Sequence, residues 1–184
     1  MKKIILILSL CVSGILFSQE KPTEEIKIKK SLNERKHEVK IGAIKLLSGP
    51  IFEGTYENIH SKDFTYGGSI LVNLSNSEND YPEDFSITPF VRFYFQESKE
   101  YGAYGFFVEG FGKFISGQYE PLLFDSEDKE KYTAASIGIS LGKKWVNNSG
   151  FVFELLVGAG RNIGNADNAP DASFRGDLNI GYRF

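Results

Sequence analysis

The sequence predicts an all-β fold, an eight-stranded antiparallel up-and-down transmembrane β-barrel. Three observations predict it. Stretches of roughly ten residues, in which apolar and polar side chains alternate, are separated by clusters of Gly, Asn, Asp, Ser and Pro, the pattern of strands joined by turns. The polar positions of these stretches carry small or charged side chains. The longer connections mostly follow every second stretch, as in barrels that cross an outer membrane.

The composition agrees with this fold class. A chain of 184 residues has room for one domain with a closed core. Aromatic residues make up 14% of it and 19 residues are Gly, which suits strands and tight turns better than a helical bundle. The low mean hydropathy argues against several transmembrane helices, whereas the strands of a transmembrane barrel need to be apolar only at alternate positions.

The first 18 residues have the layout of a secretory signal peptide. Two lysines precede an apolar run from Ile4 to Phe17, and Ser18 follows before a polar stretch. We therefore expect residues 1–18 to be removed, residues 19–37 to form a flexible periplasmic tail, and residues 38–184 to form the barrel. Removal of the signal peptide takes away Cys11, the only cysteine, so the mature chain has no disulfide or thiol chemistry.

Eight strands are predicted: Glu38–Leu47, Ile51–Ile59, Phe64–Leu74, Phe85–Phe95, Tyr104–Ser116, Thr133–Val146, Phe151–Asn162 and Ser173–Phe184. The last alternates most clearly, with Phe174 and Tyr182 on one face and Arg175 and Asp177 on the other. Alternation alone does not decide whether the apolar face points inward, as in a soluble lipocalin-like barrel, or outward into lipid. The interior of an eight-stranded barrel is just wide enough for side chains, so a small and charged polar face favours a filled polar lumen.

Loop lengths indicate which end of the barrel faces outward. The segments 76–84, 117–132 and 163–172 follow the third, fifth and seventh strands, whereas 146–150 is a tight turn. The link from Leu47 to Ile51 is an exception, because it is short where a surface loop is expected. Pro89 removes a ladder hydrogen bond within the fourth strand and is expected to mark a bulge. On the fifth strand, Gly110 and Gly112 would face lipid, which the alternation does not explain.

Charged side chains on the polar face are expected to meet inside the barrel. They are Glu57, Arg92, Glu109, Lys113, Lys144, Glu154, Arg175 and Asp177. Isolated charges are costly in such a place and opposite charges should pair, in particular Arg175 with Asp177. Two interpretations remain open, a structural ion-pair network and a narrow ion path.

Other candidate sites are weaker. Lipid-modifying enzymes on such barrels need a His with a Ser or carboxylate partner near the outer end. Here His37 lies at the entry to the first strand and His60 in a turn, so we expect no enzyme, and we expect no metal and no cofactor. The loop after the fifth strand holds an apolar group, Tyr119, Leu122, Leu123 and Phe124. This group forms either a loop binding patch or a cover over the barrel mouth.

Two resemblances extend this interpretation. The alternating residues Leu178, Ile180, Tyr182 and Phe184 resemble the C-terminal signal that the barrel-assembly machinery reads in outer-membrane proteins. The segments ITPFVRFYF, GFFVEGFGKF and SIGISLGKKWVNNSGFVFELLVGAGRNIG resemble an uncharacterised family of small outer-membrane β-barrel proteins of Bacteroidetes, a domain of unknown function with an OmpA/OmpX-like eight-stranded architecture. This resemblance covers residues 38–184, and it implies a fold and a location but no activity and no site residues.

The resulting expectation is a monomeric, exported protein of the cell outer membrane with a structural or surface-interaction role through extracellular loops. Its expected partners are outer-membrane lipid, lipopolysaccharide, and the barrel-assembly machinery and periplasmic chaperones during biogenesis. No nucleic acid is expected, since loss of the two signal-peptide lysines changes the formal charge from -3 to -5. The alternatives are a narrow channel, a lipid-modifying enzyme, and a soluble periplasmic lipocalin-like binding barrel.

Overall fold

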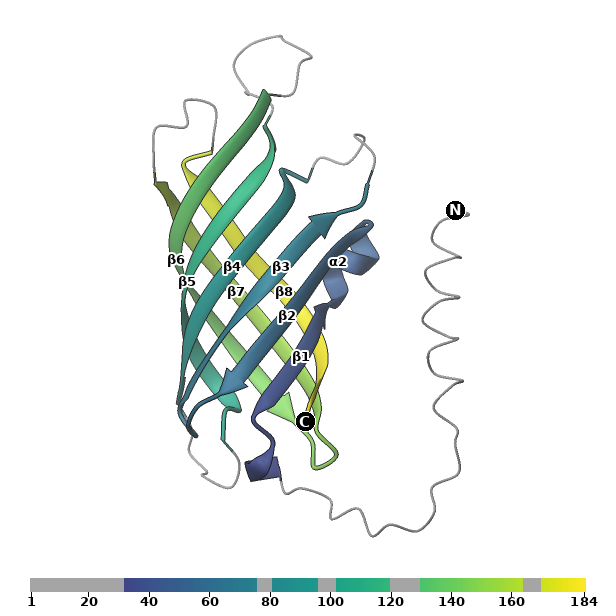
Figure 1. Ribbon diagram of the computed structural model, residues 1–184, viewed down its shortest axis with the longest axis vertical. Coiled ribbons are helices and arrows are strands. Elements are labelled where there is room, and N and C mark those ends of the chain that lie inside the picture. The colour runs from purple at the N-terminus through teal and green to yellow at the C-terminus, as the bar shows by residue number, and fades with distance from the viewer. Residues whose placement is uncertain (1–31, 76–80, 96–101, 120–129, 164–169) are drawn as a thin grey trace, which may run out of the picture.

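The computed structural model is a closed barrel of antiparallel strands that follow one another around the wall in chain order (Figure 1). It describes residues 32–75, 81–95, 102–119, 130–163 and 170–184. Eight strands form the wall, and the first pairs with the last to close it. The predicted all-β, eight-stranded, up-and-down barrel is therefore confirmed.

The strand bounds lie close to the predicted ones, except in the first strand. The strands are β1 (His37–Gly42), β2 (Ile51–Ile59), β3 (Phe64–Asn73), β4 (Glu83–Phe95), β5 (Gly105–Tyr119), β6 (Glu130–Val146), β7 (Phe151–Ile163) and β8 (Ala172–Arg183). A 3-10 turn, η1 (Leu32–Glu34), precedes β1, and a short helix, α2 (Ala43–Ser48), follows it. β2 has the predicted bounds because turn residues flank its alternating run on both sides.

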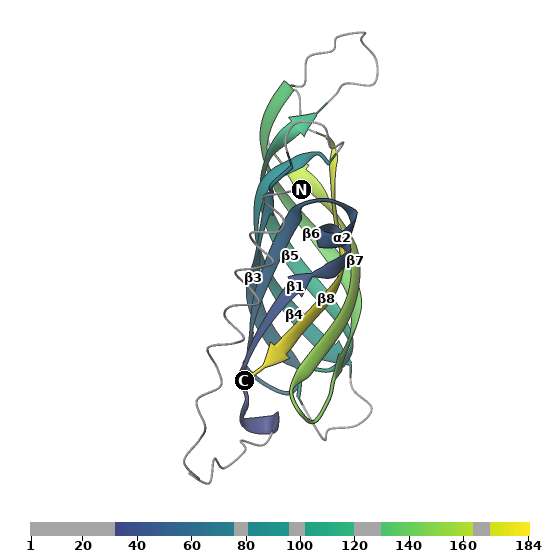
Figure 2. The same ribbon diagram turned by 90° about the vertical axis from the view of Figure 1, so that its right-hand side faces the viewer.

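The first strand is shorter than predicted, which corrects the expected range Glu38–Leu47. β1 ends at Gly42, and the next residues, rich in Ala, Leu and Lys, form α2 because these residues have high helix propensity. The connection after β1 therefore spans residues 43–50 and is no longer the short exception. α2 lies above the end of β1 and contacts both β2 and β8, where a longer β1 would have run (Figure 2).

Residues 32–37 are folded against the barrel, although the expected flexible tail reached to His37. Arg35 donates a hydrogen bond to the carbonyl of Ser149 at 2.7 Å, which attaches η1 to the β6–β7 turn. His37 already belongs to β1, and it exchanges backbone hydrogen bonds with Phe184 at 2.8 and 3.2 Å. Residues 32–37 therefore belong to the barrel. The signal peptide and residues 19–31 lie outside the described residues.

Pro89 does not mark a bulge, contrary to the expectation. On either side of it, Ile87 pairs with Phe114 and Phe90 with Phe111, so the register of β4 against β5 is unchanged. The irregularity lies instead between Glu83 and Phe85. Proline removes a donor from the ladder, and no inserted residue is needed to accommodate that loss.

The two faces of the wall differ sharply in polarity. Outward-facing Ile137, Ile139 and Phe174 have exposed fractions of 61%, 64% and 65%, whereas the alternate residues Ser136 and Ser140 are buried inside. Exposed aromatic side chains gather near the end of the barrel where the chain ends: Tyr66, Phe93, Phe95, Phe106, Trp145, Phe151, Tyr182 and Phe184. Among the described residues, no helix is long and apolar enough to cross a membrane.

Candidate functional site

The lumen holds the densest group of charged side chains in the described structure. All eight predicted lumen residues are buried there: Glu57, Arg92, Glu109, Lys113, Lys144, Glu154, Arg175 and Asp177. They come from strands β2 and β4 to β8, because each occupies an inward-pointing position of an alternating strand. Alternation along the strands therefore places these charged side chains together in the interior of the barrel.

Arg92 is the centre of this group. Its Nη1 donates to Glu57 and to Glu154, each at 2.7 Å, and its Nε donates to Glu109 at 2.7 Å. The guanidinium also lies 4.3 Å from the ring centroid of Phe90 and 4.5 Å from that of Phe107. One planar cation therefore joins three carboxylates between two aromatic rings, an arrangement suited to the fork of donors that only arginine presents.

Two lysines complete the coordination of Glu57. Lys40 donates to Glu57 at 2.5 Å and to Glu154 at 2.7 Å. Lys144 donates to Glu57 at 2.8 Å and to Glu38 at 2.7 Å. Together with Arg92, three cations surround one fully buried carboxylate, which offsets the cost of removing these charges from water.

A second layer of ion pairs lies nearer the end at which β8 begins. Arg175 donates to Glu109 at 2.7 Å, to Glu53 at 3.2 Å and to the Ser69 hydroxyl at 3.1 Å. Lys113 pairs with Glu83. Each of these contacts spans the barrel or links neighbouring strands, so the upper interior is also filled by paired charge.

Asp177 does not pair with Arg175, which corrects the expectation. Its Oδ1 accepts the backbone N–H of Ile44 at 3.0 Å, and its Oδ2 lies 3.6 Å from the Nζ of Lys45. Lys45 also pairs with Glu53. The reason is the short first strand: α2 brings a backbone donor and a lysine to Asp177, while Arg175 points toward the opposite wall.

The lumen charges balance among the described residues. Seven carboxylates are present: Glu38, Glu53, Glu57, Glu83, Glu109, Glu154 and Asp177. Seven cationic side chains pair with them: Lys40, Lys45, Arg92, Lys113, Lys144, Arg175 and Arg183. This balanced set is called the lumen network below. It can hold the strands together and exclude small ions, since its charges already satisfy one another.

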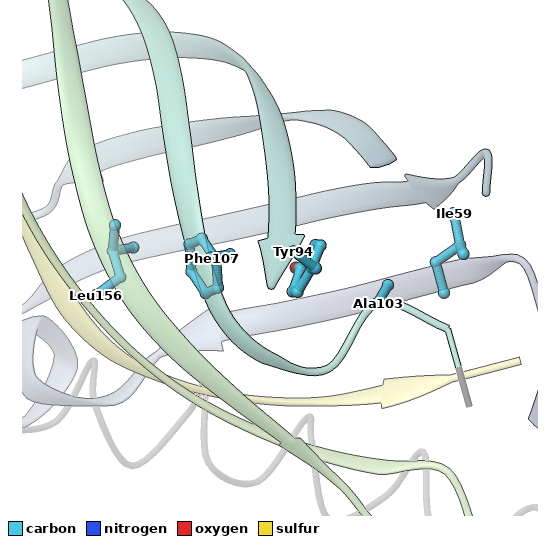
Figure 3. Close-up of a cluster of buried hydrophobic side chains, with 5 residues drawn as sticks. All are labelled: Ile59, Tyr94, Ala103, Phe107 and Leu156. Carbon is cyan, nitrogen blue, oxygen red and sulfur yellow. The ribbon is translucent and has the colours of Figure 1, made fainter. Parts of the chain in front are cut away.

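A cluster of buried hydrophobic side chains lies at the end of the lumen where the chain terminates, the lower end in Figure 1, and Figure 3 shows its members. It consists of Ile59, Tyr94, Ala103, Phe107 and Leu156. Beside this cluster, Arg183 donates to the carbonyls of Gly102 at 2.7 Å and Ala103 at 2.8 Å, and it pairs with Glu38. These bonds hold Gly102 and Ala103, which precede β5, against the wall at this end of the lumen.

Six members of the lumen network were not predicted: Glu38, Lys40, Lys45, Glu53, Glu83 and Arg183. Four of them, Glu38, Lys40, Glu53 and Arg183, occupy inward-facing positions of their strands, so the alternation of the sequence could have identified them. Glu38 and Lys40 alternate with exposed Val39, and Glu53 shares a face with Glu57. Lys45 lies on α2, where strand parity carries no information.

The remaining predicted residues occupy other places. In the assembly signal, Leu178 and Ile180 are half-buried on the outer face of β8, and Tyr182 and Phe184 are exposed near its end. In the loop patch, Leu122, Leu123 and Phe124 lie outside the described residues. The backbone of Tyr119 ends β5 opposite Glu130, and its side chain lies outside the described part.

Both histidines lie at the lower end. The Nδ1 of His37 is hydrogen-bonded to the Tyr56 hydroxyl at 2.7 Å. The ring of His60 lies edge-on to Phe64, with centroids 6.2 Å apart, while the Ser61 hydroxyl accepts the N–H of Phe64 at 3.0 Å. The Ser61 hydroxyl therefore stabilises the turn between β2 and β3. In the described part of the chain, no group of three His, Cys, Asp or Glu side chains has an arrangement that would hold a metal ion.

Lumen-facing glycines make room for aromatic rings. A Cβ on Gly142 would collide with the ring of Phe107 and with the backbone carbonyl of Leu155, and a Cβ on Gly138 would collide with Phe111. These rings in turn flank the arginines of the lumen network. The glycines of β6 are therefore part of the packing that positions the charges.

We expect Gly142→Ala to lower the free energy of unfolding by about 1–3 kcal/mol, because overpacking displaces Phe107 and the neighbouring strand. Urea unfolding in detergent micelles, followed by the fluorescence of the single tryptophan, measures this. Gly68→Ala is the matched control, since a Cβ there has only ordinary contact, 3.7 Å from the Thr88 carbonyl. Equal stability of the two variants would contradict the packing role.

Comparison of the chain with protein-family models, with curated proteins and with solved structures finds no match.

Proposed function

We propose that this chain is an exported outer-membrane β-barrel protein that acts at the cell surface through its extracellular loops, while the lumen network stabilises the barrel. The observation that carries the proposal is the polarity of the wall. Charged groups fill the interior, and exposed apolar side chains such as Leu141 and Val157 cover the outside. A water-soluble barrel has the opposite arrangement, because water favours polar groups on the outer face.

The distribution of outward-facing aromatics and cations supports the same orientation. The Nζ of Lys143 lies 4.5 Å from the ring centroid of Phe106 and 5.2 Å from that of Trp145, near the lower rim. Aromatic rings and long cationic side chains are enriched where hydrocarbon meets headgroups. In the proposed orientation this rim lies at the periplasmic interface, and the connections after β3, β5 and β7 lie outside the cell.

The β5–β6 hairpin supports a role at the surface. Its ladder continues to the pair Tyr119 and Glu130, whereas β7 stops pairing with β6 at Ala135. In Figure 1 the two strands rise above the rest of the wall. A hairpin whose strands project in this way holds the two ends of its connection beyond the rest of the wall, a position suited to recognition.

Fractionation of cells and heat-modifiable gel mobility test the proposal. We expect the mature chain in the outer-membrane fraction, with a mobility that changes on boiling because the folded barrel resists the detergent. A chain recovered in soluble periplasm, with no change on boiling, would overturn the proposal in favour of a lipocalin-like protein. Lipid A deacylation or acyl transfer by the wild type, lost in His60→Ala, would make it an enzyme.

The closed interior leads to a separate expectation. Purified protein in a planar bilayer should show no discrete conductance steps, because the lumen network is paired and the hydrophobic cluster lies at the lower end. Reproducible steps that change in Arg92→Ala or Glu154→Ala would replace the structural interpretation with a narrow channel.

A further inference from the structure

A groove of about 1300 Å³ lies on the outer wall over β5, β6 and β7. Its apolar floor and sides include Gly110, Gly112, Ile137, Ile139 and Ala159. Its volume exceeds the roughly 300–1,000 Å³ of ordinary small-molecule pockets, so it has room for an extended chain.

The glycines on the floor are not required by the barrel. A Cβ on Gly110 would lie 3.8 Å from Val91, and one on Gly112 would lie 3.9 Å from the Ser136 carbonyl, which are ordinary contacts. Neither glycine has a positive φ. Larger residues would therefore fit in this lipid-facing wall, and the open space is a property of the groove and not a by-product of strand packing.

Arg161 supplies charge to the groove. It is exposed and points outward from β7, on the same face as Ala159 and Ile163. Among the described residues it makes no hydrogen bond or ion pair through its side chain, in contrast to the paired arginines of the lumen. An unpaired guanidinium beside an apolar groove complements a ligand that is both phosphorylated and acylated.

Arg161 also lies at the appropriate height. It is two residues from the end of β7 on the side of the long connections, which the proposed orientation assigns to the outer leaflet. Asp171, which immediately precedes β8, is the one carboxylate among the described lining residues. Asp171 is exposed and forms no ion pair with Arg161, so the guanidinium stays available to a ligand at this edge of the groove.

We propose that this groove binds a phosphorylated lipid of the lipid A class, with an acyl chain over Gly110 and Gly112 and a phosphate on Arg161. The inference rests on the proposed function, because the groove meets such lipid only if the wall faces the outer leaflet. It gives the two outward glycines a role that strand alternation does not.

Native mass spectrometry of the purified mature protein in detergent tests the groove. The probes are bis-phosphorylated lipid A, lipid A without phosphates, and phosphatidylglycerol. We expect one lipid A to remain bound per chain, with phosphatidylglycerol at least about tenfold weaker. Gly112→Leu should weaken lipid A binding by about tenfold or more, since the added side chain fills the groove.

Arg161→Gln should weaken binding of the phosphorylated form by about tenfold and leave the form without phosphates unchanged, because only the charge-assisted contact is lost. Gly68→Leu is the control for Gly112→Leu: it adds the same side chain to the outer wall, on β3, away from the groove. We expect it to bind lipid A as the wild type does.

Heat-modifiable mobility of each preparation separates lost binding from lost folding. Folded Gly112→Leu that binds lipid A like the wild type would overturn the groove, and so would phosphatidylglycerol bound as tightly as lipid A. In both cases the proposed function would stand. Wild-type protein found outside the outer membrane would instead overturn the proposed function, and this inference with it.

Discussion

Arg92→Leu should lower the free energy of unfolding by about 3–5 kcal/mol, because it leaves buried carboxylates without their shared cation. Arg92 is 1% exposed and donates to Glu57, Glu109 and Glu154 at 2.7 Å. Urea unfolding in detergent micelles measures the loss. The signal is the fluorescence of Trp145, which lies on the outer face and outside the lumen network.

Two further variants keep this prediction decisive. Lys131→Met removes an exposed, outward-facing cation from the start of β6 and should change stability by less than about 0.5 kcal/mol. Glu154→Gln in the Arg92→Leu background should restore part of the loss, since it removes the one negative charge that the lost guanidinium leaves in excess in the lumen network. A loss below about 1 kcal/mol in Arg92→Leu would mean that the pairs behave like solvated surface salt bridges.

Leu141→Arg should lower stability in phospholipid vesicles by about 2–4 kcal/mol, because in the proposed outer-membrane barrel it places a cation in the middle of the wall that faces lipid. Leu141 is 59% exposed and lies outside the lining of the groove. The expected loss comes only from lipid, since the same substitution at a water-exposed strand position changes stability by about 0.5 kcal/mol or less. Reversible urea unfolding in vesicles measures it.

Thr133→Arg is the matched control on the same strand. Thr133 also faces outward, eight positions nearer the start of β6, where an arginine reaches headgroups and should cost about 0–1 kcal/mol. A large loss at Leu141 with a small one at Thr133 is therefore the signature of a bilayer. Two equally small losses would show that water covers both positions, and would contradict the outer-membrane proposal.

Membrane orientation and the lumen network depend on each other. Inside a bilayer, neither backbone nor side-chain charge can turn outward, so charged residues within the spanning region must be satisfied in the interior. The expected losses of stability in Arg92→Leu and Leu141→Arg therefore test the same arrangement, a charged interior and an apolar outer face, from the two sides of the wall. A loss at Leu141 without a loss at Arg92 would mean that water enters the lumen and screens its ion pairs.

The predicted site was incomplete for an identifiable reason. Alternation tells which side of the wall a residue faces, so it placed Arg175 and Glu154 in the lumen. It does not tell which residue stands opposite. Arg175 meets Glu53, 122 positions earlier in the chain, because the tilt and stagger of the strands bring those two heights together.

The first strand shows the limit of the pattern. The predicted strand ran on to Leu47, although Ile44 and Leu46 do not share the parity of Ile41, so the period of two is interrupted there. The structure has α2 there instead, tied to β8 by the Ile44 N–H bond to Asp177 and to β2 by Lys45 and Glu53. A six-residue helix is marginal alone, so these tertiary contacts decided the outcome.

The sequence by itself determined the number of strands, their order, and which side chains face inward, because each depends on local alternation and turn chemistry. Only the tertiary structure decided the pairing within the lumen, the replacement of the upper part of β1 by α2, and the groove at Gly110 and Gly112. These features depend on which residues of distant strands reach the same height when the barrel closes. The relative heights of the strands are set by the tilt and stagger of the whole closed barrel, so they cannot be found from any single segment of the sequence.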